Sequence, residues 1–541
     1  MACPSEDVHP AAQGAEFKRG VGLNCWKKRG RRVITILAAL AVGWVVLRAV
    51  LRLPELGVRP PFAPSEAHAD TRLGRALAPL VSDHPGKAGI LALADGRDAF
   101  AARVLLAGAA DRTLDVQYYI WHHDTSGALL FDALRKAADR GVWVRLLLDD
   151  NSTGGLDEVL AGIDAHPNIE VRLFNPFNRT ARLLGYVVDF VRVNRRMHNK
   201  SFTADGQATI VGGRNVADEY FAAGMNREFV DLDVLAVGPV AQEVARDFDR
   251  YWASESSYPA DRILPLIDAA EKAGIQASAA EKHRSAEAAP YLRAVADRAF
   301  VRDLLAGTLA FEWADARLLS DDPAKVLDRA KESTLLWPQM KEALGPPRAF
   351  FGLVSAYFVP TRTGAAGLSA LARQGVTVRV LTNSLEATDL AVVHSGYAKH
   401  RHALLSAGVE LFEIKREFAE PSVRGRGFAG SSSTSLHAKT FSIDRQRLFV
   451  GSFNFDPRSA RLNTEIGLVI ESPTLARSLS EALERAIPTR AYRVRLTDSG
   501  RLQWIEQVDG REVAHDTEPG TTIGRRALVT ALSWLPIDWL L

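Results

Sequence analysis

Two copies of one pattern of chemically active residues occur in the chain. The first copy, residues 197–215, contains His198, Lys200, Asp205, Gly212, Gly213 and Asn215. The second copy, residues 436–454, contains His437, Lys439, Asp444, Gly451, Ser452 and Asn454. In both copies seven positions separate the His from the Asp, and seven separate the Asp from the first Gly. This agreement in register indicates an internal repeat rather than chance.

These residue types fit phosphoryl chemistry. On a strand, a His-x-Lys sequence sends both side chains to one face. Two copies brought together would supply two imidazoles, two ammonium groups and two amides, which suit the charged oxygens of a phosphoryl group. One His could attack phosphorus while the other protonates the leaving oxygen. We expect no metal and no cofactor, because the lysines supply positive charge. A single copy would favour a plain core strand with incidental polar residues.

The elements around each copy also repeat. In the first half, a β-rich run at 113–121 precedes a helical pattern ending at Gly141, and buried-strand runs follow at 142–150 and 168–175. The second half repeats this order from residue 349. Tyr119 aligns with Tyr357, 79 and 80 residues before the motif His. Alternating strands and helices predict an α/β fold with a mixed, largely parallel sheet flanked by helices in each half.

The doubled motif resembles the signature of the phospholipase D superfamily. In that family, two pseudosymmetric halves meet at one active site, and the reaction passes through a phosphohistidine. The resemblance implies that His198 is the nucleophile and His437 the general acid, or the reverse. It also implies that the phosphate oxygens are held by Lys200, Lys439, Asn215 and Asn454.

Family members carry an acidic residue after each motif that orients a His. Aligning DLDVLAVGP with EIGLVIESP places Asp231 opposite Glu465, so the resemblance assigns this role to these two residues. Asp205 and Asp444 are expected to be structural and to stabilise the turn after the His-Lys strand.

Within the superfamily, the chain resembles bacterial cardiolipin synthases, specifically the C type. The resemblance covers roughly residues 71–541, through stretches such as LDVQYYIW, VGGRNVADEYF, VLTNSLEATDLAVVHSGYA and GSFNFDPRSARLNTEIG. It does not include residues 1–53. The implied reaction moves a phosphatidyl group from phosphatidylethanolamine or phosphatidylglycerol to the first His, and then to a hydroxyl of phosphatidylglycerol. The implied partners are therefore membrane phospholipids.

Composition favours a globular protein and leaves three rival functions open. The chain has 541 residues, of which 47% are hydrophobic and 24% charged, so no disordered class is indicated. A net charge of +3 is too near neutral to indicate a nucleic-acid partner. The two cysteines, Cys3 and Cys25, do not decide the compartment. A phospholipase D that uses water, a nuclease of the same superfamily and a non-catalytic scaffold remain as alternatives.

The N-terminal region predicts a membrane anchor. A basic run at 27–32 precedes the apolar stretch Val33–Leu47, and Arg48 could snorkel to extend a span to about Leu53. By the positive-inside rule, the basic run stays in the cytoplasm. We expect a single-pass protein of the bacterial inner membrane, with its catalytic halves on the periplasmic side. The alternative is a cleaved signal peptide.

These observations divide the chain into seven segments. They are a cytoplasmic segment (1–32), an anchor (33–53), a linker (54–85), the first half (86–256), a helical insertion (257–347), the second half (348–475) and a C-terminal segment (476–541). The tail contains Trp534 and Trp539, which suit either a membrane interface or a segment docked on the core. The Gly/Ser-rich stretch at 416–435 could be a mobile lid or a plain solvated loop.

Overall fold

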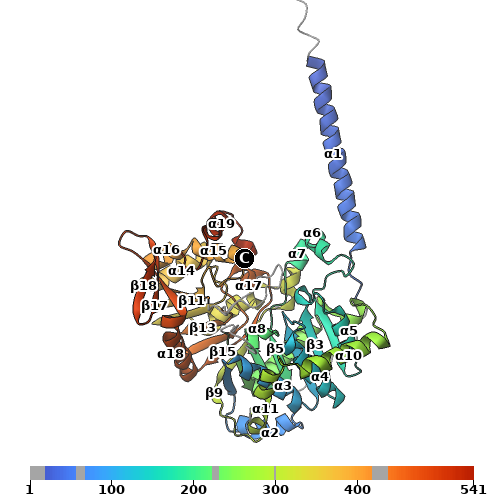
Figure 1. Ribbon diagram of the computed structural model, residues 1–541, viewed down its shortest axis with the longest axis vertical. Helices are drawn as coiled ribbons and strands as arrows, with labels where there is room; N and C mark the ends of the chain where they lie inside the picture. The colour runs from blue at the N-terminus through green and yellow to red at the C-terminus, as the bar shows by residue number, and fades with distance from the viewer. Residues whose placement is uncertain (1–18, 57–67, 222–230, 298–299, 417–435) are drawn as a thin grey trace, which may run out of the picture.

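The computed structural model describes residues 19–56, 68–221, 231–297, 300–416 and 436–541. Two α/β halves lie side by side, and one long N-terminal helix, α1 (Arg19–Val50), projects away from them (Figure 1). Residues 417–435, where a lid was one expectation, lie outside the described residues.

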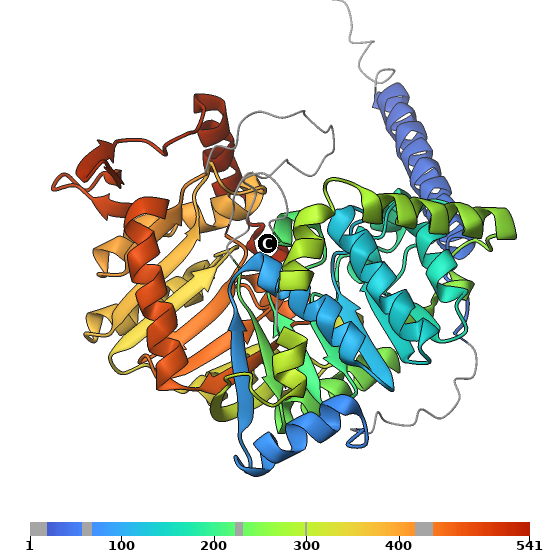
Figure 2. The same ribbon diagram turned by 60° about the horizontal axis from the view of Figure 1, so that its bottom comes forward.

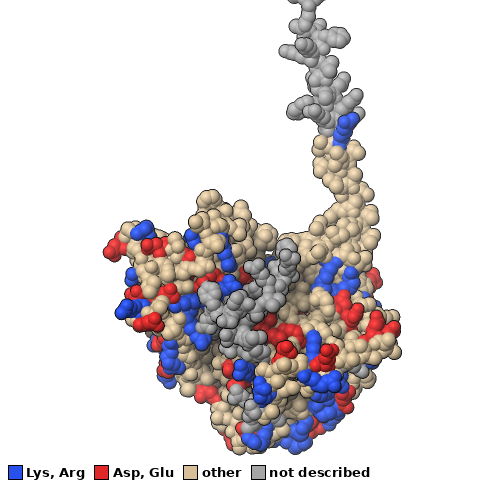
Figure 3. Space-filling view, viewed as in Figure 1, with Lys and Arg blue, Asp and Glu red and all other residues tan. Residues whose placement is uncertain are grey.

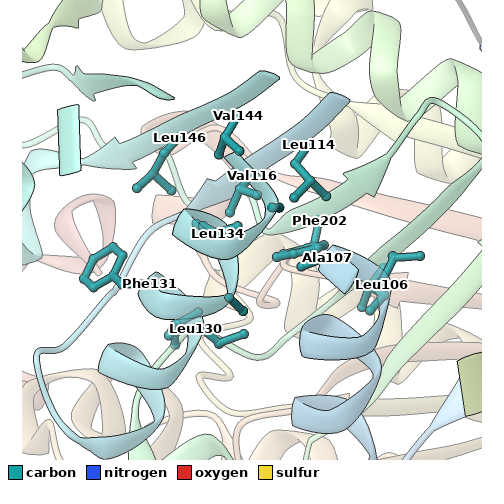
Figure 4. Close-up of a cluster of buried hydrophobic side chains, with 14 of the residues drawn as sticks. Leu106, Ala107, Leu114, Val116, Leu130, Phe131, Leu134, Val144, Leu146 and Phe202 are labelled. Atoms are coloured by element: carbon teal, nitrogen blue, oxygen red, sulfur yellow. The ribbon is translucent and has the colours of Figure 1, made fainter. Parts of the chain in front are cut away.

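A helix-covered sheet forms the first half. The helix α4 (Thr125–Asp139) begins at Asp124, whose carboxylate accepts the Gly127 N–H, and the chain reverses at Gly141 with φ 95°. One face of α4 packs on β2 (Thr113–Tyr118) and β3 (Trp143–Asp149), beside α3 (Gly96–Ala109). Figure 4 shows Leu134 of α4 facing Val116 of β2, and both residues belong to one buried cluster with Leu130 and Val144. This core fixes the strand ends that lead to the motif.

Among the described residues, nine strands form the sheet of the first half, in the order β8-β4-β3-β2-β5-β6-β7-β1-β9. The remaining strands are β1 (Ala88–Leu93), β4 (Ile169–Phe174), β5 (Ser201–Ala204), β6 (Ala208–Gly212), β7 (Asp233–Val237), β8 (Ser257–Pro259) and β9 (Glu312–Ser320).

The second half repeats this central pattern in the order β9-β15-β14-β13-β10-β11-β12-β16-β17-β18. Its strands are β10 (Phe350–Ser355), β11 (Thr377–Asn383), β12 (Glu410–Ile414), β13 (Lys439–Ile443), β14 (Arg447–Gly451), β15 (Ile466–Glu471), β16 (Ala491–Leu496), β17 (Leu502–Val508) and β18 (Arg511–His515). Figure 2 shows α18 (Pro473–Arg490) crossing these strands.

Each half has the expected mixed sheet, but the expectation that the sheet would be largely parallel was wrong. Between the named strands of the described residues, pairing is parallel only in β2-β3-β4 and β10-β11-β12, and the other ladders are antiparallel. Helical crossovers such as α4 produce the parallel neighbours, whereas β5-β6 and β13-β14 are joined by tight turns, which only antiparallel strands allow. Each half is therefore a mixed sheet.

The segment 257–347 contributes strands as well as helices. It holds α10 (Ala269–Arg284), α11 (Ala289–Asp297), α12 (Phe300–Leu305) and α13 (Leu336–Leu344), but β8 also pairs with β4. Its strand β9 pairs with β1 at one end and with β15 at the other, so it joins the two sheets. The Ala-rich and charged composition that suggested a helical insertion also suits this half-exposed strand.

The C-terminal segment belongs to the second half. The strands β16, β17 and β18 extend its sheet beyond β12. The helix α19 (Ile523–Ser533) packs against α15 (Ala391–Ala398). At the chain end, the carbonyl of Leu541 accepts the Arg458 N–H, while Trp534 and Trp539 remain exposed. The end of the tail therefore docks on the core, whereas the membrane interface remains a prediction for its exposed tryptophans.

The helix α1 is long and apolar enough to cross a membrane. Its stretch Arg32–Val50 has 19 residues and a mean hydropathy of 2.3, and none of it is buried against the rest of the protein. At 1.5 Å per residue this stretch spans about 28 Å, close to the hydrocarbon thickness of a bilayer. The helix ends at Val50, slightly before the expected end at Leu53.

Candidate active site

The two halves meet at the motifs through main-chain hydrogen bonds. Met197 and Thr464 form a parallel bridge. The His198 N–H donates to the Thr464 carbonyl at 2.9 Å, and the Thr464 N–H donates to the Arg196 carbonyl at 2.9 Å. His198 thus lies in an extended segment just before β5, held by a segment of the second half.

Each motif His takes its carboxylate partner from the other half. His198 Nδ1 lies 2.8 Å from Glu465 Oε2, and His437 Nδ1 lies 2.7 Å from Asp231 Oδ2. Sequence alignment found both carboxylates but did not show that the pairs cross between halves. A carboxylate at Nδ1 fixes the ring and leaves Nε2 available for chemistry. In the described residues, each motif His–carboxylate pair is therefore complete only when both halves are present.

Both motif lysines are buried beside the histidines. Lys200 Nζ donates to the His198 carbonyl at 2.6 Å. Lys439 Nζ donates to the His437 carbonyl and lies 3.0 Å from His437 Nδ1. Burial lowers the pKa of Lys200 to about 7 and that of Lys439 to about 8. An anionic ligand would stabilise their charged forms, so the site suits a phosphate group.

The motif asparagines are also buried, next to tyrosines. Asn215 Oδ1 accepts the Ile120 N–H at 3.1 Å, and its Nδ2 donates to the Tyr220 hydroxyl at 3.1 Å. Asn454 Oδ1 lies 3.5 Å from the Tyr357 N. These contacts orient the amides. The Asn215 oxygen and one of its two amide hydrogens are used in hydrogen bonds within the protein, which leaves the other amide hydrogen for a ligand.

Sequence reasoning missed four residues of the site. The rings of Tyr119 and Tyr220 lie edge-on to His198 and His437, with centroids 5.0 and 4.9 Å apart. Tyr357 lies beside Asn454, and Ser459 donates to Glu465 Oε1 at 2.7 Å. A signal was present in the sequence: Tyr119 aligns with Tyr357, and Tyr220 and Ser459 each lie five positions after a motif Asn.

Close packing explains the motif glycines. A Cβ on Gly213 would lie 2.1 Å from Asp231 Oδ1, and a Cβ on Gly212 would lie 2.1 Å from Asp233 Oδ1. A Cβ on Gly451 would lie 2.3 Å from the Ile466 carbonyl oxygen. Ser452 stands where the first copy has Gly213, and its hydroxyl donates to Glu465 Oε2. The glycines therefore let the carboxylate-bearing strands approach.

The motif aspartates hold the turns behind the site. Asp205 accepts the N–H groups of residues 111–113, and Asp444 accepts those of residues 348–350. Both have positive φ, 54° and 52°, which Asp tolerates better than most residues. Each ties the turn after its motif strand to the start of the neighbouring strand.

The two carboxylates have opposite pKa shifts. Burial raises the pKa of Glu465 to about 7. Burial also raises the pKa of Asp231, but His437, Lys439 and Arg214 outweigh it and lower the pKa to about 2. Burial and the neighbouring lysines lower the pKa of both histidines, that of His437 to about 3. Both imidazoles are therefore neutral near pH 7 before a substrate binds.

Among the described residues, one group has several potential metal ligands close together: His122, Asp124 and Glu219, whose ligand atoms lie within 4.8 Å of one another. Asp124 already accepts the N–H groups of Gly127 and Asp218 through its two oxygens. Helix capping accounts for Asp124, while His122 and Glu219 pair with each other at 3.6 Å, and the His-Lys residues take no part in this group.

Comparison with known proteins decides the family. The sequence model described as "Cardiolipin synthase, PLD-like domain" matches residues 105–252 and again residues 342–487. The chain belongs to the cardiolipin synthase family of the phospholipase D superfamily. The two matches fall in the two halves, so this member of the family contains the domain twice.

Relatives of known sequence agree with this placement. Cardiolipin synthase C of Escherichia coli is 50% identical over 474 residues, covering 87% of this chain and 100% of that protein. An uncharacterized protein of Helicobacter pylori is 31% identical over 480 residues, covering 85% and 90%. The crystal structure of phosphatidylserine synthase from Haemophilus influenzae has a TM-score of 0.56 at 13% identity, covering 87% and 100%, and shows the shared fold.

Proposed function

We propose that this protein is a cardiolipin synthase that works by transphosphatidylation through a phosphohistidine. The crossed pairs His198–Glu465 and His437–Asp231 carry the proposal, because they place two oriented imidazoles in one site beside two lysines. Two histidines divide the work of nucleophile and acid, as a two-step transfer requires. The relationship to the Escherichia coli enzyme supports the same reaction.

In the first step, His198 Nε2 attacks the phosphorus of the donor lipid. A P–N bond forms, the bond from phosphorus to the headgroup oxygen breaks, and His437 gives a proton to that oxygen. Lys200 and Lys439, with Asn215 and Asn454, stabilise the negative oxygens. For His437 to act as an acid it must first be protonated, and the anionic substrate and Asp231 both favour its charged form.

In the second step, His437 takes a proton from a glycerol hydroxyl of phosphatidylglycerol. That oxygen attacks phosphorus, the P–N bond breaks and His198 is regenerated, which leaves cardiolipin. The electrostatics favour this assignment of roles: Asp231 stays ionised and stabilises an imidazolium at His437, whereas Glu465 titrates near pH 7.

The donor is phosphatidylethanolamine or a second phosphatidylglycerol. The test uses the full chain in vesicles, with labelled phosphatidylglycerol and the second lipid varied. We expect cardiolipin, stimulated by phosphatidylethanolamine, with phosphatidic acid as a minor product. Dominant phosphatidic acid would mean that water is the acceptor and that the protein is a phospholipase D. Activity on DNA but not on lipid would identify a nuclease.

The same proposal places the catalytic halves on the periplasmic side of a bacterial inner membrane, anchored by α1. The basic residues Lys27, Lys28, Arg29, Arg31 and Arg32 precede the apolar stretch and favour a cytoplasmic N-terminus. A reporter fused after Leu541 should be active only if it requires export. Activity of a cytoplasm-dependent reporter there would overturn the topology, and a mature protein starting after Leu53 would replace the anchor with a signal peptide.

A further inference from the structure

Outside α1, most of the exposed large apolar side chains in the described part of the chain fall in two segments. The first patch lies on η2 (Arg182–Leu184), α6 (Gly185–Val188) and α7 (Phe190–Val193), and consists of Leu183, Leu184, Tyr186, Val187, Phe190 and Val191. The second patch lies on α19 and the tail, and consists of Ile523, Leu528, Trp534, Leu535 and Trp539. Leu183 and Trp534 are each 81% exposed. Concentrations of this kind mark interaction surfaces.

Both patches lie at the end of the molecule from which α1 emerges. In Figure 1, α6 and α7 lie beside the base of α1, and α19 lies at the same end of the second half. The helix α6 also contacts α1 directly. In Figure 3, the surface over α19 and at the base of α1 is largely free of Lys, Arg, Asp and Glu. A membrane crossed by α1 would therefore face both patches.

The charged residues of the two patches suit an anionic lipid surface. Residues 180–193 and 523–541 each contain two Arg and one Asp. Asp189 is paired with Arg192 of the same patch and Asp538 with Lys399, while Arg182 lies 3.8 Å from Asp150. The side chains of each segment carry a net charge of +1. An excess of Arg beside Trp, Leu and Val is the composition of segments that lie in the membrane interface.

Hydrogen bonds connect the patches to the site. Tyr186 of α6 donates to Asn151 Oδ1 at 2.6 Å, and Asn151 Nδ2 donates to the Tyr119 hydroxyl at 3.3 Å. Tyr119 lies edge-on to His198. In the second half, Arg525 of α19 donates to the Thr388 carbonyl at 2.8 Å, next to Asp389, which accepts the Tyr357 hydroxyl. The patches therefore adjoin the walls of the active site.

We propose that the two patches form a paired docking surface that rests on the bilayer crossed by α1 and holds the active site against the lipid headgroups. The proposal rests on the proposed function, because a lipid substrate gives such a surface its purpose. Apolar side chains of this kind enter the interface to a depth of about 5–10 Å. One patch on each half would support the site from both sides.

Depth measurements in vesicles test the surface. The full chain, with Cys3→Ser, Cys25→Ser and His198→Ala, receives one labelled cysteine at a time and is placed in vesicles of phosphatidylethanolamine and phosphatidylglycerol. The test positions are Val187, Val191, Trp534 and Trp539, each changed to Cys. The control is Trp143→Cys, because Trp143 is exposed at the end of β3 opposite Asp149, which bonds to Met197 beside the site. We expect an apolar emission shift and quenching by spin-labelled lipids at the test positions only.

Each outcome separates the docking surface from the enzyme activity. If the labels in either patch emit as they do in water, the proposal of a paired docking surface is refuted, even if the wild type makes cardiolipin. Lipid quenching in both patches, without cardiolipin formation by the wild type, would retain the surface and overturn the activity. Labels that are shielded in detergent and escape lipid quenching would show that a second copy covers the patches, which also overturns the proposal.

A functional measurement complements these depths. Val187→Asp with Val191→Asp, and separately Trp534→Ser with Trp539→Ser, should lower the rate on vesicles roughly tenfold, because less apolar surface enters the interface. The same variants should keep their rate on lipid dispersed in detergent micelles. Trp143→Ser, which removes an exposed Trp elsewhere, should change neither rate. Equal losses on vesicles and micelles would contradict docking as the cause.

Discussion

The two half-sites contain matching residue types but surround their carboxylates differently. In the first, His198 with Glu465, the carboxylate accepts hydrogen bonds from Ser452 and Ser459, and burial raises its pKa to about 7. In the second, His437 with Asp231, positive neighbours outweigh burial and lower the carboxylate pKa to about 2. One carboxylate is fixed as an anion, and the other changes its charge near neutral pH.

Two positions inside the repeat change the surroundings of these carboxylates. Where the first copy has Arg214, whose charge lowers the pKa of Asp231, the second copy has Phe453, stacked on Trp337. Where the first copy has Gly213, the second has Ser452, whose hydrogen bond to Glu465 lowers the pKa of that carboxylate but is outweighed by burial. Near symmetry in sequence therefore permits distinct chemistry: a fixed anion suits an acid–base His, and a titrating group suits a nucleophile that must remain neutral.

Removing either histidine should have the largest effect. We expect His198→Ala and His437→Ala to lower cardiolipin formation by at least about a thousandfold, because each His performs a part of both steps that the other cannot. With labelled donor lipid, His437→Ala should accumulate labelled protein and His198→Ala should not. Label on His198→Ala alone would exchange the two roles, and a near wild-type rate in either variant would refute the two-histidine mechanism.

Neutralising the two carboxylates should lower the reaction rate by different amounts. We expect Asp231→Asn to lower kcat/KM by about 10²–10⁴-fold, since it removes the anion that stabilises the His437 imidazolium. Glu465→Gln should cost only about tenfold, because Glu465 is already half protonated near pH 7 and its amide retains one acceptor. The measurement is the rate of cardiolipin formation in vesicles. A larger loss for Glu465→Gln would reverse the comparison.

The lysines should make anion binding depend on pH in two steps. Their pKa values are lowered, so both are charged below pH 7, and the charge is lost as pH rises through about 7 for Lys200 and about 8 for Lys439. The affinity for tungstate, a phosphate-like dianion, should fall about tenfold per pH unit above each step. Calorimetry should show the lower step missing in Lys200→Met and the upper step missing in Lys439→Met.

Ionisation of Glu465 would weaken anion binding in the same pH range, so Glu465→Gln is the control. The step near pH 7 should persist in that variant if Lys200 causes it. A pH-independent affinity in the wild type would contradict the lowered lysine pKa values.

The sequence could predict the repeat, because one fold used twice leaves the same spacing twice. It pointed to the histidines, lysines and both carboxylates, and the structure brings these residues together. It could not predict the crossing of the pairs, because Glu465 reaches His198 only through the Thr464 bridge between halves. Contacts between segments 267 residues apart leave no local pattern.

Strand direction was the main error in the fold. Apolar runs such as β5 and β13 indicate burial but carry no sign of direction, which depends on the connection. The turns at Asp205 and Asp444 were visible in the sequence, and a tight turn between two strands already requires an antiparallel pair. The pairing of β9 with both sheets depends on tertiary contacts that residue patterns do not encode.

The smallest expected effect concerns these two aspartates, which play the same structural part in different surroundings. Each accepts three main-chain N–H groups, but Asp205 is fully buried and Asp444 is half-buried. An Asn retains one acceptor oxygen and tolerates positive φ, so the substitution removes charge-assisted hydrogen bonds with little backbone cost. We expect Asp205→Asn to lower the free energy of unfolding by about 2–3 kcal/mol and Asp444→Asn by about 1 kcal/mol, because water can replace lost bonds only at Asp444.

Thermal unfolding in detergent measures the difference, and cardiolipin formation per folded molecule should stay near the wild-type rate in both variants. Equal losses of stability would mean that burial does not distinguish the two turns, and a selective loss of activity would place these carboxylates in the reaction.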